Sequence, residues 1–448
     1  MRKYVDNVAN LGRVSPKGCK NSSGATRQTT PAHGEFKECT LDDIAEFRNG
    51  KALSPDMYLP FGQHPVFGSN GQIARTNEVL TKEPLVVIGR VGAYCGSVHH
   101  VDEPAWITDN AIIATGKDQT DVRFLFYLLG FLELRRTAIG SAQPLMTQGG
   151  LKVVPAIAPP LAEQKTIAHI LGTLDDKIEL NRRMNATLEA MARALFQSWF
   201  VDFDPVRAKL DGRKPAGLDA AAAAFFPAHF QDSEDGRLPV GWRYVAIEKL
   251  CAINSWTLGK GDDLDTLEYV EISEVNRGNI ANIATYQRGD EPSRARRRLR
   301  HGDTVLSTVR PDRGSYFLAL KPPENRVAST GFAVLTPTKA PWAFIHAALT
   351  QADFSEHLGQ LADGGAYPAV RPEIIGAWKV VVPDQAGILD AFQNICAPLF
   401  EQAEANRNQS RTLATLRDAL LPKLISGELR IPYLSTGLQG IITEQLIK

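Results

Sequence analysis

The chain has 448 residues, of which 44% are hydrophobic and 22% charged, a composition typical of a globular protein with more than one core. Fifty lysine and arginine residues balance fifty aspartate and glutamate residues, so any surface that binds a polyanion must be local. The sequence contains no apolar run of about 18 residues and no signal-peptide block, which argues against membrane insertion and secretion. Its scattered cysteines lack Cys-x-x-Cys spacing, which argues against a zinc site and predicts reduced thiols in the cytoplasm.

The first 35 residues are basic and polar, with six lysines and arginines against Asp6 and Glu35. A segment with so few large apolar residues cannot bury a core, so residues 1–35 are predicted to form a disordered arm. The arm could contact phosphates through its cations, or it could be a solvated tail or an extended translation start.

Residues 36–158 contain short apolar runs separated by glycine-rich turns, which predicts a first domain of mixed helices and strands. Three of its loops offer polar groups: the Asn70-Gly71 hairpin signal, the glycine-flanked turn at Arg90, and the loop 140–148. Such side chains can read base edges in the major groove of DNA, although each loop could also be an ordinary surface turn. The candidate DNA contacts of this domain are Asn70, Gln72, Arg90, Gln143 and Thr147.

Residues 159–201 carry the pattern of a long helix that begins after Pro159-Pro160. Apolar residues recur every seven positions over four heptads, which is coiled-coil spacing. The heptad positions are Ile167, Leu174, Asn181, Leu188 and Leu195, and the intermediate positions are assigned to Leu171, Ile178, Met184 and Met191. A helix of about 40 residues would be on the order of 60 Å long.

A linker at residues 202–238 leads to a second mixed domain at residues 239–383. Glycine-containing loops of this domain supply its candidate DNA contacts, which are Arg310, Arg313, Tyr367 and Arg371. A dense basic stretch contains Arg296, Arg297 and Arg298, and it could contact phosphates or be a solvated face.

Residues 384–427 repeat the long helical pattern, and residues 428–448 are assigned to a tail. The heptad positions of this helix are Phe392, Leu399, Asn406, Leu413 and Leu420, with Ile388, Ile395 and Leu416 between them. Pro398 is expected to kink the first half of the helix.

An asparagine occupies the central heptad position of both helices, Asn181 in the first and Asn406 in the second. A polar residue in such a seam costs stability and fixes the register of the helices. We expect an antiparallel pair in which these two asparagines lie side by side and Ile167 faces Leu420. In the alternative, each helix packs only on its own domain and the asparagines are exposed.

An internal repeat defines the architecture. Four pairs of segments match: 41–47 with 247–253, 142–144 with 366–368, Val153–Pro155 with Val381–Pro383, and Asn181-Arg182 with Asn406-Arg407. Arg310 is aligned with Arg90 at an offset of 220. The repeat predicts two copies of a mixed domain followed by a long helix.

Five separated stretches resemble, in order, those of specificity subunits of type I restriction-modification systems. They are residues 159–185 (PPLAEQKTIAHILGTLDDKIELNRRMN), 196–242, 306–316 (LSTVRPDRGSY), 328–335 (ASTGFAVL) and 416–429 (LRDALLPKLISGEL). The resemblance covers nearly everything from about residue 36 to residue 430.

The resemblance implies an α+β fold in which two mixed α/β target-recognition domains are separated by two long antiparallel coiled-coil helices, with a pseudo-twofold internal repeat. It also implies a subunit that binds double-stranded DNA, two methyltransferase subunits and restriction/translocase subunits. Such a subunit directs adenine methylation or ATP-dependent cleavage and performs neither. No cofactor is expected on this chain, while S-adenosylmethionine, ATP and Mg are expected on the partner subunits.

An autonomous nuclease or methyltransferase is an alternative class of function, for which the sequence offers no motif. The Gly-Lys pairs at 50, 116 and 259 lack the context of a phosphate-binding loop, and no Asn/Asp-Pro-Pro-Tyr/Phe motif of an amino-methyltransferase is present. The adjacent pairs His99-His100, Asp42-Asp43 and Asp175-Asp176 are better explained as strand and helix surfaces than as metal or acid-base sites. The remaining alternative to DNA reading is a coiled-coil scaffold, which would leave the glycine-flanked arginine loops unexplained.

Overall fold

The computed structural model describes residues 36–140, 144–234, 236–259, 261–362 and 368–430. The predicted basic arm and most of the predicted tail lie outside these residues. The chain divides into two compact units: unit 1 comprises residues 1–178 and 412–448, and unit 2 comprises residues 179–411. Two long helices, α5 (Leu161–Phe196) and α11 (Ala386–Ile425), contribute a part to each unit. In the described part of the chain, no helix is long and apolar enough to cross a membrane.

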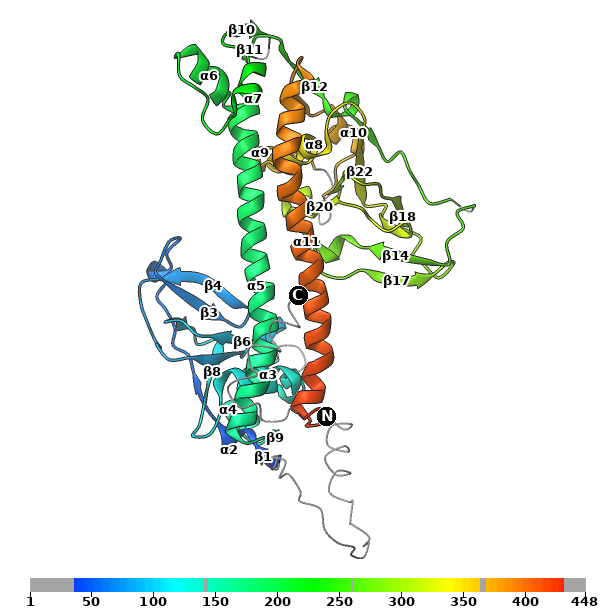
Figure 1. The fold of residues 1–448 in the computed structure, drawn as a ribbon. Coiled ribbons are helices and arrows are strands. Elements are labelled where there is room, and N and C mark those ends of the chain that lie inside the picture. The colour runs from blue at the N-terminus through cyan, green and yellow to red at the C-terminus, as the bar shows by residue number, and fades with distance from the viewer. Residues whose placement is uncertain (1–35, 141–143, 235, 260, 363–367, 431–448) are drawn as a thin grey trace, which may run out of the picture. The chain divides into compact units, whose positions relative to one another are not determined.

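Unit 1 is built on a four-stranded antiparallel sheet in the order β2-β8-β5-β6. These strands are β2 (Ala45–Asn49), β8 (Ala111–Gly116), β5 (Leu85–Gly89) and β6 (Val98–Val101). Strands β6 and β8 are labelled in Figure 1. β5 is buried along its whole length, as its apolar sequence predicts. The helix α3 (Val122–Phe131) contacts β5, β6 and β8 and buries Phe124, Leu125 and Leu128.

Two smaller sheets complete unit 1. β1 (Lys37–Thr40) pairs with β9 (Pro155–Ala158), and β3 (His64–Gly68) lies between antiparallel β4 (Gly71–Thr76) and parallel β7 (Trp106–Ile107). The short helical elements are α2 (Leu41–Ile44), η1 (Pro55–Met57), η2 (Gly92–Tyr94), η3 (Leu134–Thr137) and α4 (Gln148–Lys152). The core of unit 1 includes residues of both long helices, namely Ile167, Leu171, Leu424 and Ile425, with Leu420 packed against it.

Unit 2 contains a second copy of this architecture. Its four-stranded sheet has the order β13-β22-β19-β20, formed by β13 (Cys251–Ile253), β22 (Phe332–Pro337), β19 (Asp303–Ser307) and β20 (Tyr316–Ala319). The helix α8 (Trp342–Leu349) contacts β19 and β22, as α3 contacts the sheet of unit 1. β12 (Trp242–Ala246) pairs with β23 (Lys379–Pro383), as β1 pairs with β9. β14 (Thr266–Val270) lies between antiparallel β17 (Ala284–Gln287) and parallel β21 (Arg326–Ser329), and β18 (Ala295–Arg298) extends this sheet beyond β21.

Twelve further elements complete the described part of unit 2. They are η4 (Gln197–Val201), α6 (Asp204–Leu210), α7 (Ala220–Phe225), β10 (Phe230–Ser233), β11 (Gly236–Pro239), η5 (Ile247–Lys249), η6 (Ile272–Glu274), β15 (Val275–Asn276), β16 (Asn279–Ile280), η7 (Pro311–Arg313), α9 (Ala352–Leu361) and α10 (Pro372–Ala377). η4 is a π-helical turn that follows α5 and buries Trp199 and Phe200. The ring of Phe200 lies 4.9 Å from that of Phe344 in α8 and 5.2 Å from that of Phe392 in α11.

The two units together confirm the α+β fold class, with a mixed sheet-rich region on each side of α5 in the sequence.

Backbone hydrogen bonds give the register of the internal repeat and correct one of its predicted matches. The amide of Leu41 donates to Val154 (2.9 Å) and the amide of Ile247 donates to Trp378 (2.9 Å), so Leu41 and Ile247 are equivalent, as predicted. Val154 is therefore equivalent to Trp378, and the predicted match of Val153–Pro155 with Val381–Pro383 is wrong by four residues. The two segments share the residues Val-Val-Pro, but the equivalence is defined by the backbone hydrogen bonds. Many different side chains are compatible with the same backbone pairing, so identical residues need not occupy equivalent positions.

The helical seam in unit 2 differs in detail from its prediction. Met184, Met191 and Ile395 are 38%, 53% and 41% exposed, whereas the next residue in each case (Asn185, Ala192 and Cys396) is buried. The intermediate positions of α5 therefore fall four residues after each heptad position throughout, as Leu171 and Ile178 do. The sequence placed Met184, Met191 and Ile395 in the seam because their side chains are apolar, but apolar side chains can also be exposed on a helix surface. α11 continues past Pro398 to Ile425.

Candidate nucleic-acid interface

Three of the loops singled out in the first domain meet around Arg90. The amide of Arg90 donates to the carbonyl oxygen of Asn110 (3.0 Å), and its Nη1 donates to the carbonyl oxygen of Asp109 (3.1 Å). The carbonyl oxygen of Arg90 accepts from the amide of Met146 (2.8 Å), which joins this loop to the segment before α4. We call residues 69–72, 89–92, 109–110 and 144–147 the first loop cluster.

The hairpin turn between β3 and β4 is fixed to this cluster through Ser69. The Ser69 hydroxyl donates to the carbonyl oxygen of Asn110 (2.5 Å) and accepts from the amide of Val91 (3.3 Å). Asn70 and Gln72 remain exposed beside it. The turn thus holds two amide side chains at the surface next to Arg90.

The loop that follows in the sequence is described only in part. Gln143 lies outside the described residues. The Thr147 hydroxyl accepts from the amide of Gly150 (3.0 Å), so it caps the N-terminus of α4. A base contact by Thr147 stays a prediction. Its hydroxyl would have to contact a base while it also caps α4.

The second domain has an equivalent cluster, formed by residues 308–314 and 368–371. The carbonyl oxygen of Thr308 accepts from the amide of Val370 (2.8 Å), and the amide of Arg310 donates to the carbonyl oxygen of Pro368 (2.7 Å). Arg313 and Arg371 are exposed in this second loop cluster. Tyr367 lies outside the described residues.

The predicted alignment of Arg310 with Arg90 is wrong by two residues. Arg90 and Thr308 are equivalent because their carbonyl oxygens accept the matching bonds from Met146 and Val370. Arg310 is instead equivalent to Gly92, whose amide donates to Pro144 (3.2 Å). Both positions are left-handed, with φ of +75° at Gly92 and +47° at Arg310. The backbone conformation is conserved between the copies, while an arginine occupies a different position in each.

Thr147 and Arg371, by contrast, are equivalent as predicted. Thr147 is the residue before α4 and Arg371 the residue before α10, and both have extended backbone conformations. The two copies therefore present different side chains at the same point of the fold.

The basic stretch of the second domain forms β18 and is largely paired within the domain. Arg298 has a side chain only 6% exposed, bonds Asp262 Oδ1 (2.7 Å) and stacks on Trp256 at 4.0 Å. Arg296 is more accessible at 35% and bonds Glu291 (3.2 Å). Burial lowers the pKa of Arg297, whose Nε is buried with no described group as acceptor. Phosphate contact by the three arginines stays a prediction, and the structure leaves Arg296 the most accessible of them.

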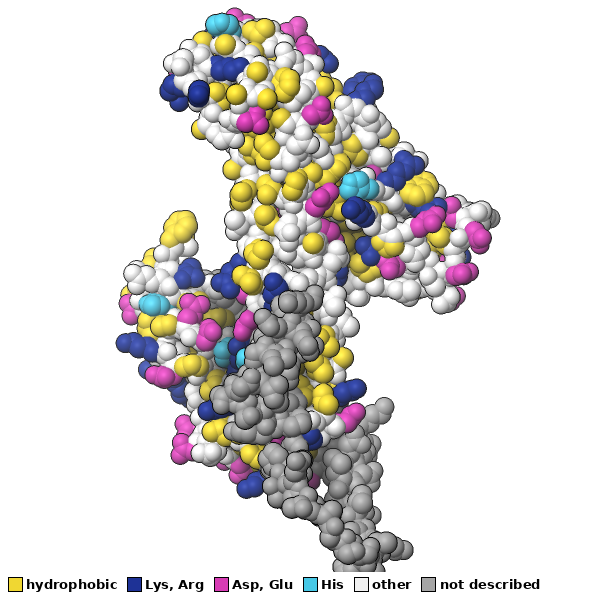
Figure 2. Space-filling model, viewed as in Figure 1, with side chains coloured by type: hydrophobic (Ala, Val, Ile, Leu, Met, Phe, Trp, Pro, Cys, Tyr) yellow, Lys and Arg dark blue, Asp and Glu magenta, His cyan; other side chains and the backbone are white. Residues whose placement is uncertain are grey.

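Charge is mixed over the surface. On the face shown in Figure 2, lysine and arginine side chains alternate with aspartate and glutamate over both sheet-rich regions. The described residues contain no group of three histidine, cysteine, aspartate or glutamate side chains that could hold a metal ion.

The two seam asparagines lie in contact within unit 2. Asn181 Nδ2 lies 3.3 Å from the backbone oxygen of Asn406 and 2.9 Å from Gln409 Oε1. Asn406 Nδ2 donates to Asn185 Oδ1 (2.9 Å), and Asn185 Nδ2 donates to the oxygen of Ala403 (3.0 Å). This is the proximity that the antiparallel register requires, while the role of Asn181 and Asn406 in fixing that register stays a prediction.

Four further residues were not predicted from the sequence: Asn185 in the seam, Arg277 and Gly278 in a hairpin turn, and Trp256 stacked on Arg298. Asn185 could have been found from its spacing of four residues after Asn181. Arg277-Gly278, between β15 and β16, has the letters of a tight turn. Trp256 gave no signal, because its arginine partners lie about 40 residues further along the chain.

The chain was compared with known proteins. Residues 33–190 match the family model of the type I restriction modification DNA specificity domain. The type I restriction enzyme HindI specificity subunit of Haemophilus influenzae is 25% identical over 318 residues, which is 59% of this chain and 67% of the relative. The type I restriction enzyme MjaIX specificity subunit of Methanocaldococcus jannaschii is 24% identical over 328 residues, which is 71% of each chain.

The fold is similar to a solved structure as well. The crystal structure of a type I restriction-modification system S subunit from M. genitalium superposes with a TM-score of 0.57 and 17% identity, covering 89% of this chain and 98% of that one. The chain is thus similar in sequence to type I restriction enzyme specificity subunits, and similar in fold to a solved S subunit.

Proposed function

We propose that this chain reads a split, non-palindromic sequence in double-stranded DNA, with each loop cluster contacting one half-site. One observation carries the proposal: the same hydrogen-bonded loop arrangement occurs twice with different exposed side chains. The first cluster presents Asn70, Gln72 and Arg90, and the second presents Arg313 and Arg371 beside Arg310. Because amides pair with adenine and arginine with guanine, unlike side chains would select unlike bases.

The chain would act as the non-catalytic subunit of a cytoplasmic complex. Its partners would be two methyltransferase subunits and restriction/translocase subunits, which would hold S-adenosylmethionine, ATP and Mg. The match of residues 33–190 to the specificity-domain family model supports this assignment, as do the relatives named as specificity subunits of type I restriction enzymes. The side chains of Met184, Met191 and Ile395 are apolar and exposed on the long helices, where such partners could bind them.

The test uses Arg90→Ala and Arg310→Ala in the full chain assembled with methyltransferase subunits. Each variant is expected to relax base preference at one half-site, and the two variants at different half-sites, by about tenfold or more per contacted base. Methylated positions on a randomised DNA library would measure this. Arg136→Ala is the matched control, because Arg136 is exposed and pairs only locally with Glu133 in the contacts described.

Two outcomes would contradict the proposal. If both variants retain the base preferences of the Arg136→Ala control, the loop clusters do not read DNA. If the assembled complex shows no sequence preference that follows this chain, a scaffold role replaces DNA reading.

A further inference from the structure

A hairpin in the second domain connects its helix pair to its loop cluster. β15 and β16 form this hairpin, with Arg277 and Gly278 in the turn at φ of +43° and +82°. The hairpin is inserted between β14 and β17, where unit 1 has only the short turn between the corresponding strands β3 and β4. The insertion therefore distinguishes one copy of the repeat from the other.

One side of the turn lies against an ion pair between the two long helices. Glu189 of α5 and Arg407 of α11 form this pair, and their side chains are only 20% and 13% exposed. A Cβ added to Gly278 would lie 2.9 Å from Arg407 Nη2 and 3.5 Å from Glu189 Oε1. The left-handed backbone at Gly278 favours glycine, and an added side chain there would also require the end of the Arg407 side chain to shift.

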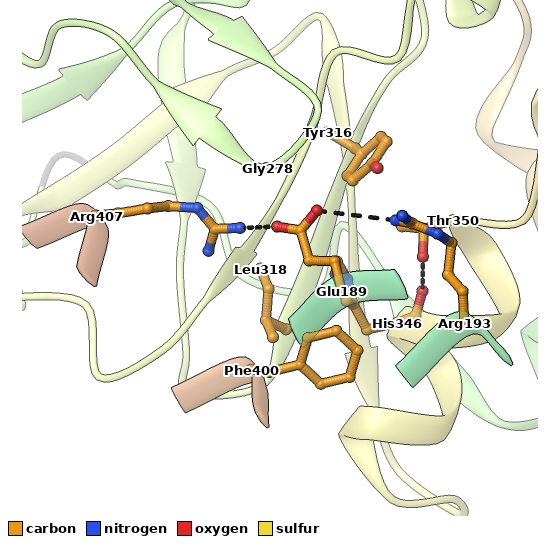
Figure 3. A pocket seen from close by; sticks show the side chains of 9 residues that line it. All are labelled: Glu189, Arg193, Gly278, Tyr316, Leu318, His346, Thr350, Phe400 and Arg407. Atoms are coloured by element: carbon orange, nitrogen blue, oxygen red, sulfur yellow. Dashed lines mark hydrogen bonds and ion pairs between the residues drawn. The ribbon is translucent and has the colours of Figure 1, made fainter. Parts of the chain in front are cut away.

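Further charges hold the ion pair in place. Figure 3 shows the Glu189 carboxylate between the guanidinium groups of Arg407 and Arg193, with Arg193 Nη1 3.8 Å from Glu189 Oε2. Glu404 Oε2 lies 3.3 Å from Arg407 Nη1. Loss of the Glu189 charge would remove the carboxylate that lies between the two guanidinium groups and leave Glu404 as the described carboxylate partner of the largely buried Arg407.

The other side of the turn holds the end of the predicted recognition loop. The amide of Arg277 donates to the carbonyl oxygen of Gly314 (2.7 Å), and the amide of Gly278 donates to that of Tyr316 (2.7 Å). Gly314 has a φ of +73°, and a Cβ there would lie 3.0 Å from Arg277 Cγ. The turn therefore contacts the helix pair and the loop with adjacent residues.

We propose that Glu189, Arg407 and Gly278 are positioning residues for the loop Arg310–Gly314 and set base discrimination at one half-site without touching DNA. The inference rests on the proposed function of that loop. The first loop cluster is supported differently, because the turn at Gly71 packs on the ring of His99, whose Cε1 would lie 3.0 Å from an added Cβ. The two half-sites should therefore respond differently to changes in the helix pair.

The test compares Glu189→Gln and Gly278→Ala with matched controls in the full chain assembled with methyltransferase subunits. Glu179→Gln removes a carboxylate on the same helix that pairs with Arg182 and Arg183 alone in the contacts described. Gly217→Ala places a side chain at a φ of +72° where no atom lies within 4 Å. Base preference at each half-site is measured by selection from randomised DNA, together with thermal unfolding.

Glu189→Gln and Gly278→Ala are expected to lower discrimination by about tenfold at the half-site that Arg310→Ala affects, and to leave the other half-site unchanged. Arg407→Lys should retain more discrimination than Arg407→Ala, since it keeps the charge. The controls should behave as the unmodified chain does. If Gly278→Ala prevents folding, the isosteric Glu189→Gln and the Arg407 pair decide the question.

The possible failures are distinguishable. If Arg310→Ala weakens one half-site but Glu189→Gln matches Glu179→Gln, the positioning role is overturned and the proposed function stands. If Arg310→Ala has no effect, the recognition role of the loop falls, and the inference falls with it. Equal losses at both half-sites would indicate general destabilisation and would also overturn the inference.

Discussion

In the first mixed domain, the central strand β5 begins with Leu85, while the matching strand β19 of the second domain begins with Asp303. Strand pairing makes the two positions equivalent, because Leu85 lies opposite Val101 and Asp303 lies opposite Ala319. Both side chains are buried, with exposed fractions of 0% and 1%. The amide of Arg300 donates to Asp303 Oδ2 (2.7 Å), while Oδ1 is buried without a hydrogen-bond partner among the described residues. The same sheet therefore tolerates a polar residue where local donors exist.

The loop clusters show the complementary difference. Their backbone hydrogen bonds are the same, yet the first cluster rests on His99 and the second on a hairpin that reaches the helix pair. The buried frame has been kept in both copies, and the supports of the loops have diverged. Substitutions that exchange features between the copies can test this comparison.

The largest expected effect is that of Leu85→Asp, which places a carboxylate at the equivalent buried position of the first domain. Leu85 is fully buried in a hydrophobic core with Val87, Ile107 and Ile113. An unpaired carboxyl group there is expected to cost about 4 kcal/mol of unfolding free energy. Urea unfolding of the purified chain would measure it.

The reciprocal change Asp303→Leu is the control. It is expected to cost far less, because it removes a carboxyl group from a buried strand and leaves one amide to find another acceptor. Equal costs for the two substitutions would mean that the positions are not environmentally different and would break the comparison.

A second prediction concerns pH. Burial raises the pKa of Asp303 to about 6, although the hydrogen bond from the Arg300 amide acts in the opposite direction. The pKa of Asp303 in the folded state lies above its value in the unfolded state. The contribution of this carboxyl group to stability is therefore fully present below about pH 4 and is lost as the pH rises through 6. Asp303→Asn should therefore raise the unfolding free energy by about 3 kcal/mol well above pH 6, with a gain that vanishes near pH 4.

Thermal unfolding at several pH values between 4 and 7 would measure this gain as a function of pH. Leu85→Ala provides a matched control, since it lacks a titrating group and should change stability equally at each pH. A gain for Asp303→Asn that does not depend on pH would show that the carboxyl group does not titrate in this range.

The sequence could predict the repeat, the two long helices and the loops that present polar groups, because periodicity and glycine-rich turns are local signals. It could not distinguish Met184 from Asn185 as a seam residue, since both are compatible with helical spacing. The sequence also aligned Arg310 with Arg90. The true equivalents, Gly92 and Arg310, share a left-handed backbone conformation but not a residue type, so the sequence could not reveal their equivalence. The burial of a charged residue such as Arg298 could not be predicted either, because it depends on partners that are distant in the sequence.

The smallest expected effect concerns β18, which extends the sheet β17-β14-β21 in unit 2, whereas the described sheet β4-β3-β7 of unit 1 ends at β7. If this added strand contacts phosphates, Arg296→Ala should lower the slope of log affinity against log salt by about 1, with little change in base preference. Arg298→Ala is the control within the same strand, because its buried pairing with Asp262 should make it affect stability and not the slope. A salt titration of DNA binding by the assembled complex measures both variants. An unchanged slope for Arg296→Ala would assign the basic strand to folding alone, and a lowered slope for Arg298→Ala would mean that its pairing opens when DNA binds.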